Sequence, residues 1–399
     1  MVSRGALAAT LGVIVVVVIV TFTAVSVTKS RGGDGSVSLA LSSSSMPTSF
    51  PSLQLVSTSV LPTQLDDGDA TVDVIYNNSP TVPDSYSQRL YEYNLDVQIR
   101  NQWDTNLGYC GETSTIVAGQ LLAGQYFSQY DVRLIYCSNL GIDVNNSDCQ
   151  TQYQYLVGDG TYDMDTAMSL HMYAETYSAD NSGDGDDGVT EAYLSWVKRH
   201  VRQGHVVTIT VYDKDGTNEE YDHIVNVVGV ESNFDNNEYH ESDLLIYDDH
   251  YDDVYRVSFT DFPMTRDESA NVDGAPQWSL PRGVANYGIA HIGPIGIGLK
   301  QVKLYTSVKE ELPSIIEGQG TRPTDMLMTV YVVASGLDHG VEYNLYMYDD
   351  ETLVPENDFN INSQDAVSAD TFMADESGIY EFNFDARTSD KIIFRCVEA

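Results

Sequence analysis

The sequence predicts an α+β domain followed by an all-β domain. Segments with the three-to-four spacing of buried helices come first, between about residues 110 and 203, and runs rich in β-branched residues follow from about residue 205. Beyond about residue 300 the helical spacing disappears and short strand-like runs recur. This order favours a domain with a helical half and an antiparallel sheet half, followed by a β-sandwich.

The composition is that of a folded and strongly acidic protein. Hydrophobic residues make up 42% of the 399 positions, more than a disordered chain carries, and the length leaves room for two domains. The 59 acidic residues against 20 basic ones give a formal net charge of -39. Because such a surface repels phosphate backbones, we expect no nucleic-acid partner.

The N-terminal region predicts a membrane-engaging segment and a stalk. Residues 5–28 form one uncharged apolar run between basic residues, long enough for a helix that crosses a bilayer. The small residues Ala24-Val25-Ser26 also fit a signal-peptide cleavage position, so residues 1–29 are either an anchor or a cleaved signal. Ser-rich residues 30–94 are typical of a flexible linker. In both cases we expect the rest of the chain to be extracellular or luminal, held at a membrane or secreted.

Two of the four cysteines are expected to form a disulfide. Cys137 and Cys149 lie close together in the sequence, and an oxidising compartment would let them close a short loop. Cys396 has no evident partner, and Cys110 lies in a different context.

Helices and strands can be assigned from these patterns. The first expected helix begins at Cys110 and runs to about Ser128, the second covers residues 163–179, and the third covers residues 190–203 and ends at Gly204. The expected strands are 205–212, 223–230, 244–247, 326–334, 342–347, 378–384 and 391–396.

Cys110 has the features of a nucleophile. A thiol reacts as its thiolate, and a helix N-terminus lowers the thiol pKa because unpaired backbone N–H groups there favour negative charge. Cys110 begins the first expected helix, and Gly108 and Gly111 allow a tight turn that leaves the sulfur open. A lone cysteine is otherwise a small buried hydrophobe, so this interpretation depends on further residues.

Three other residues complete a set suited to acyl transfer. Gln102 precedes Cys110 by a short gap, and its amide can help a backbone N–H to bind the oxyanion of a tetrahedral intermediate. His223 begins a strand after a polar turn, where its imidazole can deprotonate a nearby thiol. The next expected strand leads into Asp248 and Asp249, and a carboxylate there can fix the imidazole tautomer. We expect Asp248 to be that carboxylate.

The ordered set resembles the papain-like cysteine peptidase superfamily, and more closely the branch related to the bacteriocin double-glycine leader peptidases. The matching motifs are Gln102 followed by Cys110-Gly111 and a helix, the strand HIVNVVG that begins with His223, and the strand that ends at Asp248. The resemblance implies a peptidase that hydrolyses peptide or protein substrates through an acyl-enzyme. Cys110, His223, Asp248 and Gln102 would form its active site, without a cofactor or catalytic metal.

The resemblance divides the chain and leaves alternatives open. It covers about residues 95–296 of an expected domain over residues 95–300, and residues 301–399 would form a separate β-sandwich. Glu112 opposes thiolate formation, and the gap before the thiol is longer than in papain. The motif Tyr109-Cys110-Gly111 is also similar to phytochelatin synthase. An acyltransferase of that type or of the transglutaminase-like type is therefore one alternative, and a non-catalytic pseudopeptidase that binds surfaces is another.

An acidic loop between the second and third expected helices has part of the pattern of a calcium site. Residues 180–191 run from Asp180 to Glu191 and place oxygen ligands and a glycine near the positions of an EF-hand loop. Ser182 and Asp187 depart from that pattern, so a solvated acidic loop is the competing interpretation.

Overall fold

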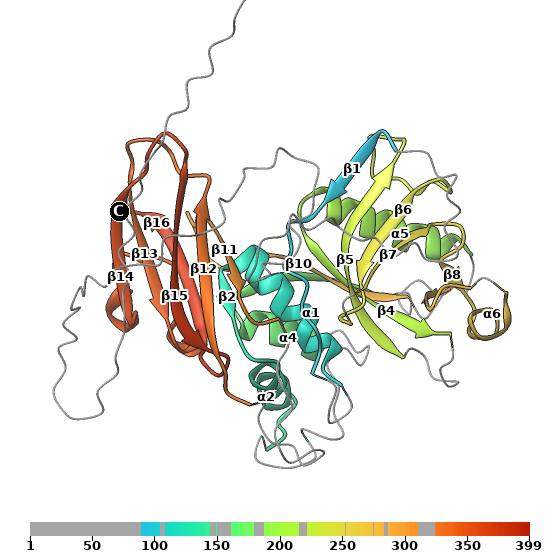
Figure 1. Cartoon of the computed structure of the whole chain (residues 1–399), viewed down its shortest axis with the longest axis horizontal. Coiled ribbons are helices and arrows are strands. Elements are labelled where there is room, and N and C mark those ends of the chain that lie inside the picture. Colours follow the sequence, from blue (N-terminus) through green and yellow to red (C-terminus); the bar gives the residue numbers. More distant parts are fainter. Residues whose placement is uncertain are drawn as a thin grey trace, which may run out of the picture. The chain divides into compact units, whose positions relative to one another are not determined.

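The fold combines α-helices with several antiparallel sheets, as Figure 1 shows. The computed structural model describes residues 89–103, 108–143, 149, 161–178, 187–214, 222–251, 253–273, 275–282, 286–309 and 324–399, all within the compact unit Ser49–Ala399. Within these ranges, no helix is long and apolar enough to cross a membrane. The expected N-terminal segment 1–29, the linker up to residue 88 and residues 180–186 of the acidic loop lie outside the described residues.

Most of the helices precede the carboxyl-terminal strands. The helical elements are α1 (Cys110–Ala118), the π-helical η1 (Gly119–Ala123), α2 (Gln129–Asn139), α4 (Thr161–Ser169), α5 (Asp187–Arg202), α6 (Arg266–Asn271), and the 3-10 turns η4 (Glu351–Leu353) and η5 (Ser363–Asp365). The strands of the first part are β1 (Tyr91–Asn94), β2 (Gln125–Tyr126), β3 (Met172–Ser178), β4 (Val206–Asp213), β5 (His223–Ser232), β6 (Leu244–Asp248), β7 (Val254–Ser258), β8 (Pro263–Met264), β9 (Trp278–Pro281) and β10 (Tyr287–Pro294). The remaining strands are β11 (Gln301–Thr306), β12 (Leu327–Ser335), β13 (Glu342–Tyr348), β14 (Ser368–Met373), β15 (Ile379–Arg387) and β16 (Ile392–Glu398).

The largest sheet forms the centre of the first part. Its strand order is β3-β10-β4-β5-β6-β7, with β1 beside β5 and β9 beside β4, and its pairs are antiparallel except β8 with β9. β4 and β5 are rich in Val and Ile and are buried over nearly their whole length, because α1 and α5 both pack against them. The core that holds α1 on the sheet therefore also fixes His223, the first residue of β5.

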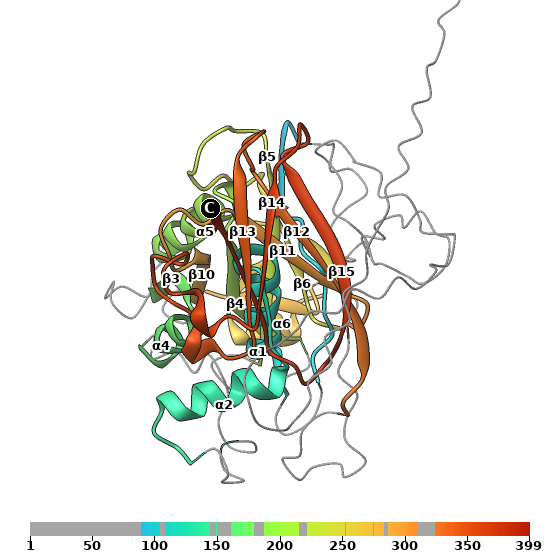
Figure 2. The ribbon, with the colours of Figure 1, turned by 90° about the vertical axis from the view of Figure 1, so that its left-hand side faces the viewer.

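The helix that begins at Cys110 lies between two hydrophobic cores. Val117 and Leu121 belong to the core of the largest sheet, whereas Ile116 and Ala123 belong to the core of the carboxyl-terminal sheets. Figure 1 shows α1 between these two groups of strands. α2 lies beside α1 in that view and in the view turned by 90° (Figure 2).

This helix ends at Ala123, earlier than the expected end near Ser128. Gly124 has a φ of 57°, a left-handed conformation that favours glycine, and a Cβ atom on it would lie 2.7 Å from Cβ of Val302. The next two residues form β2, which pairs with β16. Buried Arg395 of β16 donates to the carbonyl of Ala123 at 2.7 Å, so a cation satisfies the C-terminus of the helix.

Two further antiparallel sheets lie in the region where the sandwich is expected. One has the order β11-β12-β15 and the other the order β14-β13-β16-β2. β12 alternates buried and more exposed residues, as a strand does when one face covers a core. Apolar side chains from both sheets share a single core. Because β2 comes from residues 125–126, the second sheet includes a strand from the region assigned to the first domain.

The helix predictions are partly confirmed. α5 confirms the third expected helix, and Gly204, with a φ of 85°, follows its end. The prediction of a helix over residues 163–179 is wrong in its second half, because α4 stops and β3 pairs with β10 at the edge of the sheet. His171, with a φ of 53°, lies at the change of direction. Pairing with a sheet edge overrides the weak helical spacing there. The helix α2 was not among those expected.

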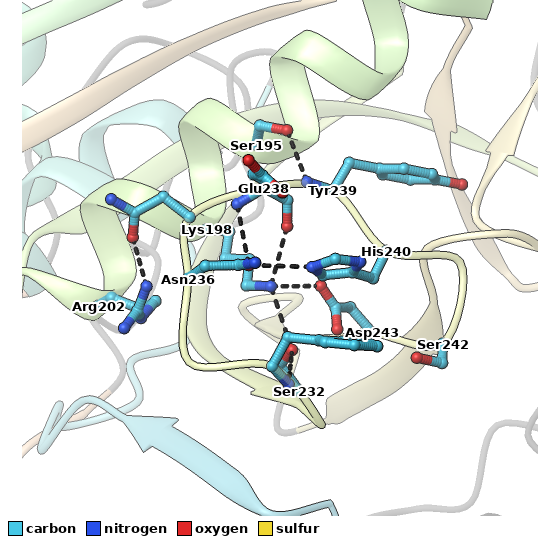
Figure 3. Close-up of polar contacts among 12 residues, drawn as sticks. Ser195, Lys198, Arg202, Ser232, Asn236, Glu238, Tyr239, His240, Ser242 and Asp243 are labelled. Carbon is cyan, nitrogen blue, oxygen red and sulfur yellow. Dashed lines mark hydrogen bonds and ion pairs between the residues drawn. The ribbon is translucent and has the colours of Figure 1, made fainter.

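A buried ion pair fastens α5 to the segment before β6. Nζ of Lys198 lies 2.6 Å from the carboxylate of Asp243, and both side chains are 0% exposed. The ammonium group also donates to Oγ of Ser232 at 3.1 Å and to the main-chain oxygen of Glu238 at 2.9 Å, as Figure 3 shows. An ammonium group has three N–H donors, so all of them are used here.

Candidate active site

Cys110 is the first residue of α1, as the sequence predicts. Gly108 has a φ of 76°, which lets the chain turn into the helix, and Tyr109 gives the helix no side-chain cap. Cys110 as a whole residue is partly exposed, but its sulfur is buried and interacts with the backbone N–H of Ile224. Because Ile224 follows His223, the structure brings the thiol and the start of β5 together.

The surroundings of the thiol favour its neutral form. Burial raises the pKa of Cys110 to about 12, and the negative charge of Glu112 acts in the same direction. The backbone N–H groups of Ile224 and Gly111 and the positive charge of Arg133 act in the opposite direction. Glu112 thus has the effect that the sequence predicts.

Arg133 of α2 organises the start of α1. Its guanidinium forms a buried ion pair with Glu112, donates to the carbonyl of Gly108, and lies 3.9 Å from the ring centroid of Tyr109. The expected disulfide Cys137–Cys149, which begins one helical turn later in α2, is confirmed. Sequence reasoning missed Arg133, because no sequence pattern indicates that a residue so far along the chain contacts the start of α1.

His223 is held in one tautomer. The residue is 3% exposed, and its Nε2 lies 2.7 Å from the main-chain oxygen of Asp249. Because a carbonyl can only accept, Nε2 carries the hydrogen, and Nδ1 is the nitrogen that can take up a proton. Burial and the charge of His250 lower the pKa of His223 to about 3, against the effect of the Asp249 carbonyl. The imidazole is therefore a neutral base at pH 7.

Two aromatic rings flank this imidazole. The ring centroids of Trp278 and Tyr251 lie 4.5 Å and 5.4 Å from that of His223. Nε1 of Trp278 donates to Oδ2 of Asp249 at 3.3 Å, so Asp249 contacts both the indole and the imidazole. Burial raises the pKa of the Asp249 carboxyl to about 6. Sequence reasoning missed Trp278, which lies far from His223 in the chain and belongs to none of the quoted motifs.

Asp248, the expected orienting carboxylate, lies against His250 and not against His223. Across β6 and β5, Asp248 is opposite Asn226, three residues beyond His223. Its Oδ2 lies 3.1 Å from Nδ1 of His250, and its Oδ1 accepts from the main-chain N–H of His250 at 2.9 Å. The group that contacts His223 is the main-chain carbonyl of Asp249, because β6 ends at Asp248 and the chain then turns.

Gln102 lies beside the start of α1. Its Nε2 is 3.4 Å from the position that a Cβ atom on Gly108 would take, two residues before Cys110. The side-chain amide donates to the hydroxyl of Tyr251, and the main-chain N–H donates to the carbonyl of His250 at 3.0 Å. The candidate oxyanion donor is therefore tied to the same turn that holds the imidazole.

These residues provide a thiol, a neutral base and an amide donor around the start of one helix. Such a set can form a covalent acyl intermediate and bind its oxyanion. In the part of the chain that the structure describes, no group of three or more His, Cys, Asp or Glu side chains could hold a metal ion. No protein-family model, no curated protein and no solved structure matches this chain.

Proposed function

We propose that this chain is a papain-like cysteine peptidase that hydrolyses peptide bonds through an acyl-enzyme intermediate. One observation carries the proposal: the sulfur of Cys110 lies against the backbone of Ile224, next to His223, whose Nε2 is bound to a carbonyl. A thiol at a helix N-terminus near a histidine of fixed tautomer is the arrangement that nucleophilic catalysis uses. The motifs around Gln102 and Cys110 that resemble this superfamily support the same function.

In the proposed reaction, Sγ of Cys110 attacks the substrate carbonyl while Nδ1 of His223 takes the thiol proton. The backbone N–H of Cys110 and the amide of Gln102 stabilise the oxyanion of the tetrahedral intermediate. The imidazolium then gives its proton to the leaving amine, and a thioester remains on Cys110. Water that His223 deprotonates hydrolyses the thioester, which releases the acid and restores the thiol.

The proposed resting state has no thiolate–imidazolium pair. Burial raises the pKa of Cys110 and lowers that of His223, so both groups are neutral before substrate binds. Proton transfer then accompanies attack on the carbonyl. We expect no thiolate absorbance near 240 nm at pH 7 in a difference spectrum between the wild type and C110A. A clear absorbance step there would contradict this resting state.

The nucleophile is tested with the full chain under native conditions. We expect a peptidyl epoxide probe to modify Cys110, with the site located by mass spectrometry, and C110A to lose the label. Cys396 is buried, so C396A is the matched control and keeps the wild-type label. H223A should slow labelling at least about tenfold, because it removes the base. Equal labelling of the wild type and C110A would refute Cys110 as the nucleophile.

The reaction is tested by analysing products of a peptide mixture, with and without an added amine. Hydrolysis yields new carboxyl termini whether or not the amine is present. Products that carry the amine at every new terminus would instead indicate an acyltransferase. A chain that is labelled at Cys110 but cleaves nothing across a broad peptide library would indicate a pseudopeptidase.

We also propose that this domain acts outside the cytosol. The apolar segment of residues 1–29 and the Cys137–Cys149 disulfide both fit an oxidising compartment. N-terminal sequencing of the expressed full chain, together with carbonate extraction of membranes, distinguishes an anchored form from a cleaved one. Full-length protein in the cytosol with both of these cysteines reduced would contradict the proposed location.

A further inference from the structure

The turn after β6 contains a residue in an unfavourable conformation. His250 has a φ of 63°, in the left-handed region that residues other than glycine seldom adopt. Such a conformation persists only where surrounding contacts impose it, and it is most frequent at functional sites. The side chain of His250 is 0% exposed, so the contacts that impose its conformation come from the protein interior.

Two residues hold the ring and backbone of His250. Nε2 lies 2.8 Å from Oγ of Ser114, and Nδ1 lies 3.1 Å from Oδ2 of Asp248 without hydrogen-bond geometry. The main-chain N–H of His250 donates to Oδ1 of Asp248 at 2.9 Å. Ser114 is four residues after Cys110 and so lies one turn further along the same face of α1. The turn is thereby attached both to the helix of the nucleophile and to the end of β6.

The backbone of this turn supplies acceptors to the candidate active site. The carbonyl of Asp249 lies 2.7 Å from Nε2 of His223, and the carbonyl of His250 accepts from the main-chain N–H of Gln102 at 3.0 Å. The hydroxyl of Tyr251 accepts from the side-chain amide of Gln102. The peptide planes on either side of His250 carry the two carbonyls, so a change of its φ would turn one acceptor relative to the other, and the two could no longer serve His223 and Gln102 together.

We propose that His250 is a positioning residue that, clamped by Ser114 and Asp248, aims the carbonyl of Asp249 at His223 and fixes its Nε2–H tautomer. The kinetic part of this proposal rests on the proposed function. The tautomer, however, is a property of the folded chain and can be measured without any activity. Ser114, His250 and Asp248 are the residue types of a serine nucleophile set, but all three are 0% exposed and so support the site from behind.

Three substitutions separate the backbone conformation of His250 from its ring. H250G removes the ring but adopts a positive φ freely, H250A removes the ring and disfavours that φ, and H250N tolerates it and keeps an amide that can bond Ser114 or Asp248. We expect kcat for peptide hydrolysis to fall about 100-fold in H250A and about tenfold in H250G, and to stay within about threefold in H250N. KM should change less than about threefold, because the substrate-binding groups remain.

The tautomer is read from the side-chain ¹⁵N chemical shifts of His223, assigned by their loss in H223Q. The wild type should show a protonated Nε2 and an unprotonated Nδ1, and H250A should show a mixture of both tautomers. H240A, which alters a partly exposed histidine in the cluster of Figure 3, is the control and should keep the wild-type signals of His223.

Each outcome decides the proposal. A folded H250A with wild-type ¹⁵N shifts would overturn it. If H250A does not fold, S114A is tested in its place, because S114A removes one contact of His250 and keeps the imidazole ring. Mixed tautomers of His223 in S114A would support the proposal, and unchanged tautomers would overturn it. If the wild type neither reacts at Cys110 nor cleaves peptides, the proposed function fails, and the ¹⁵N shifts still decide whether His250 fixes the imidazole.

Discussion

Lys198 and His223 are both buried nitrogen bases of the same domain, but their partners differ. The ammonium of Lys198 is surrounded by a carboxylate, a hydroxyl and a carbonyl, and each of its donors is used (Figure 3). His223 is bound through one ring nitrogen to a main-chain carbonyl, and the charged group that most affects it is another histidine. The carboxylate of Asp243 balances the positive charge of Lys198. Among the described residues, no carboxylate forms such a pair with the imidazole of His223.

These different partners distinguish a site that holds the structure together from a site that can take part in a reaction. A buried ammonium group with a complete set of acceptors has no unused hydrogen-bonding capacity, and removal of one partner would leave an unpaired buried charge. A buried imidazole with one fixed nitrogen can take a proton at the other when charge develops nearby. The imidazole of His223 can therefore still accept a proton, whereas every donor of the Lys198 ammonium is already engaged. Four substitutions test this difference.

The largest expected effect is on stability, from K198M. This substitution leaves Asp243 as an unpaired buried charge, so the free energy of unfolding should fall by about 3–5 kcal/mol. K198M/D243L removes both charges and should regain most of that loss. Urea unfolding followed by tryptophan fluorescence measures the change.

The rate at which folded K198M is labelled at Cys110 should equal that of the wild type. A labelling rate that changes more than about fivefold in the folded protein would show that the two sites are coupled, since distant sites act independently. Lys198 and His223 could then no longer be compared as independent sites.

The second expected effect is a dependence of stability on pH that is caused by the imidazole of His223. Its pKa is lowered from the ordinary value near 6.5 to about 3, so between these values the unfolded chain binds more protons and stability falls as the pH falls. Between pH 7 and 5 the wild type should lose about 2 kcal/mol more than H223Q. The raised pKa of Asp249 has the opposite effect, but it is present in both proteins and cancels.

Urea unfolding at both pH values measures this difference. H240Q, at a partly exposed histidine, is the matched control and should keep the wild-type dependence. Parallel curves for the wild type and H223Q would mean that the imidazole is not buried in its neutral form.

The third effect concerns the charge beside the thiol. E112Q removes a negative charge that raises the pKa of Cys110 and breaks the ion pair of Glu112 with Arg133, so alkylation by iodoacetamide at pH 8 should become about fivefold faster. Stability should fall, because Arg133 is buried. E231Q breaks another Glu–Arg pair, the more exposed one with Arg256, and should leave the alkylation rate unchanged. A slower reaction in E112Q would contradict the electrostatic role of Glu112.

The smallest effect is expected at Trp278. W278F keeps an aromatic ring over His223 but loses the indole donor to Asp249, and a hydrogen bond as long as this one contributes about 0.7 kcal/mol, so kcat should fall about threefold. W196F, which loses the bond from Nε1 of Trp196 to Glu175, is the matched control. An equal fall of kcat in both variants would show a general effect on stability.

Much of the fold could be predicted where a local pattern decides it. The helix start at Cys110, the strand start at His223 and the disulfide Cys137–Cys149 follow from apolar spacing, the glycines beside Cys110, β-branched residues and cysteine proximity. The strand β3 could not be predicted, because its residues alternate too weakly and pair with β10 only through the tertiary fold.

The candidate site was less predictable for a different reason. The group that contacts His223 is a main-chain carbonyl, which any residue can supply and no motif marks. A register shift between Val227 and Gly229 and the turn after β6 decide that Asp249, and not Asp248, places its oxygen there. Arg133 and Trp278 reach the site by packing of distant elements, which residue spacing does not report.

Arg395 has a consequence for the order in which the protein matures. It satisfies the end of the helix that contains Cys110 from 272 positions further along the chain. Because a ribosome adds residues one after another, the helix of the nucleophile waits for this partner until β16 has been translated. A growing chain therefore carries Cys110 on a helix whose C-terminus still lacks its final partner, so the proposed activity would be delayed until synthesis of this region is almost finished.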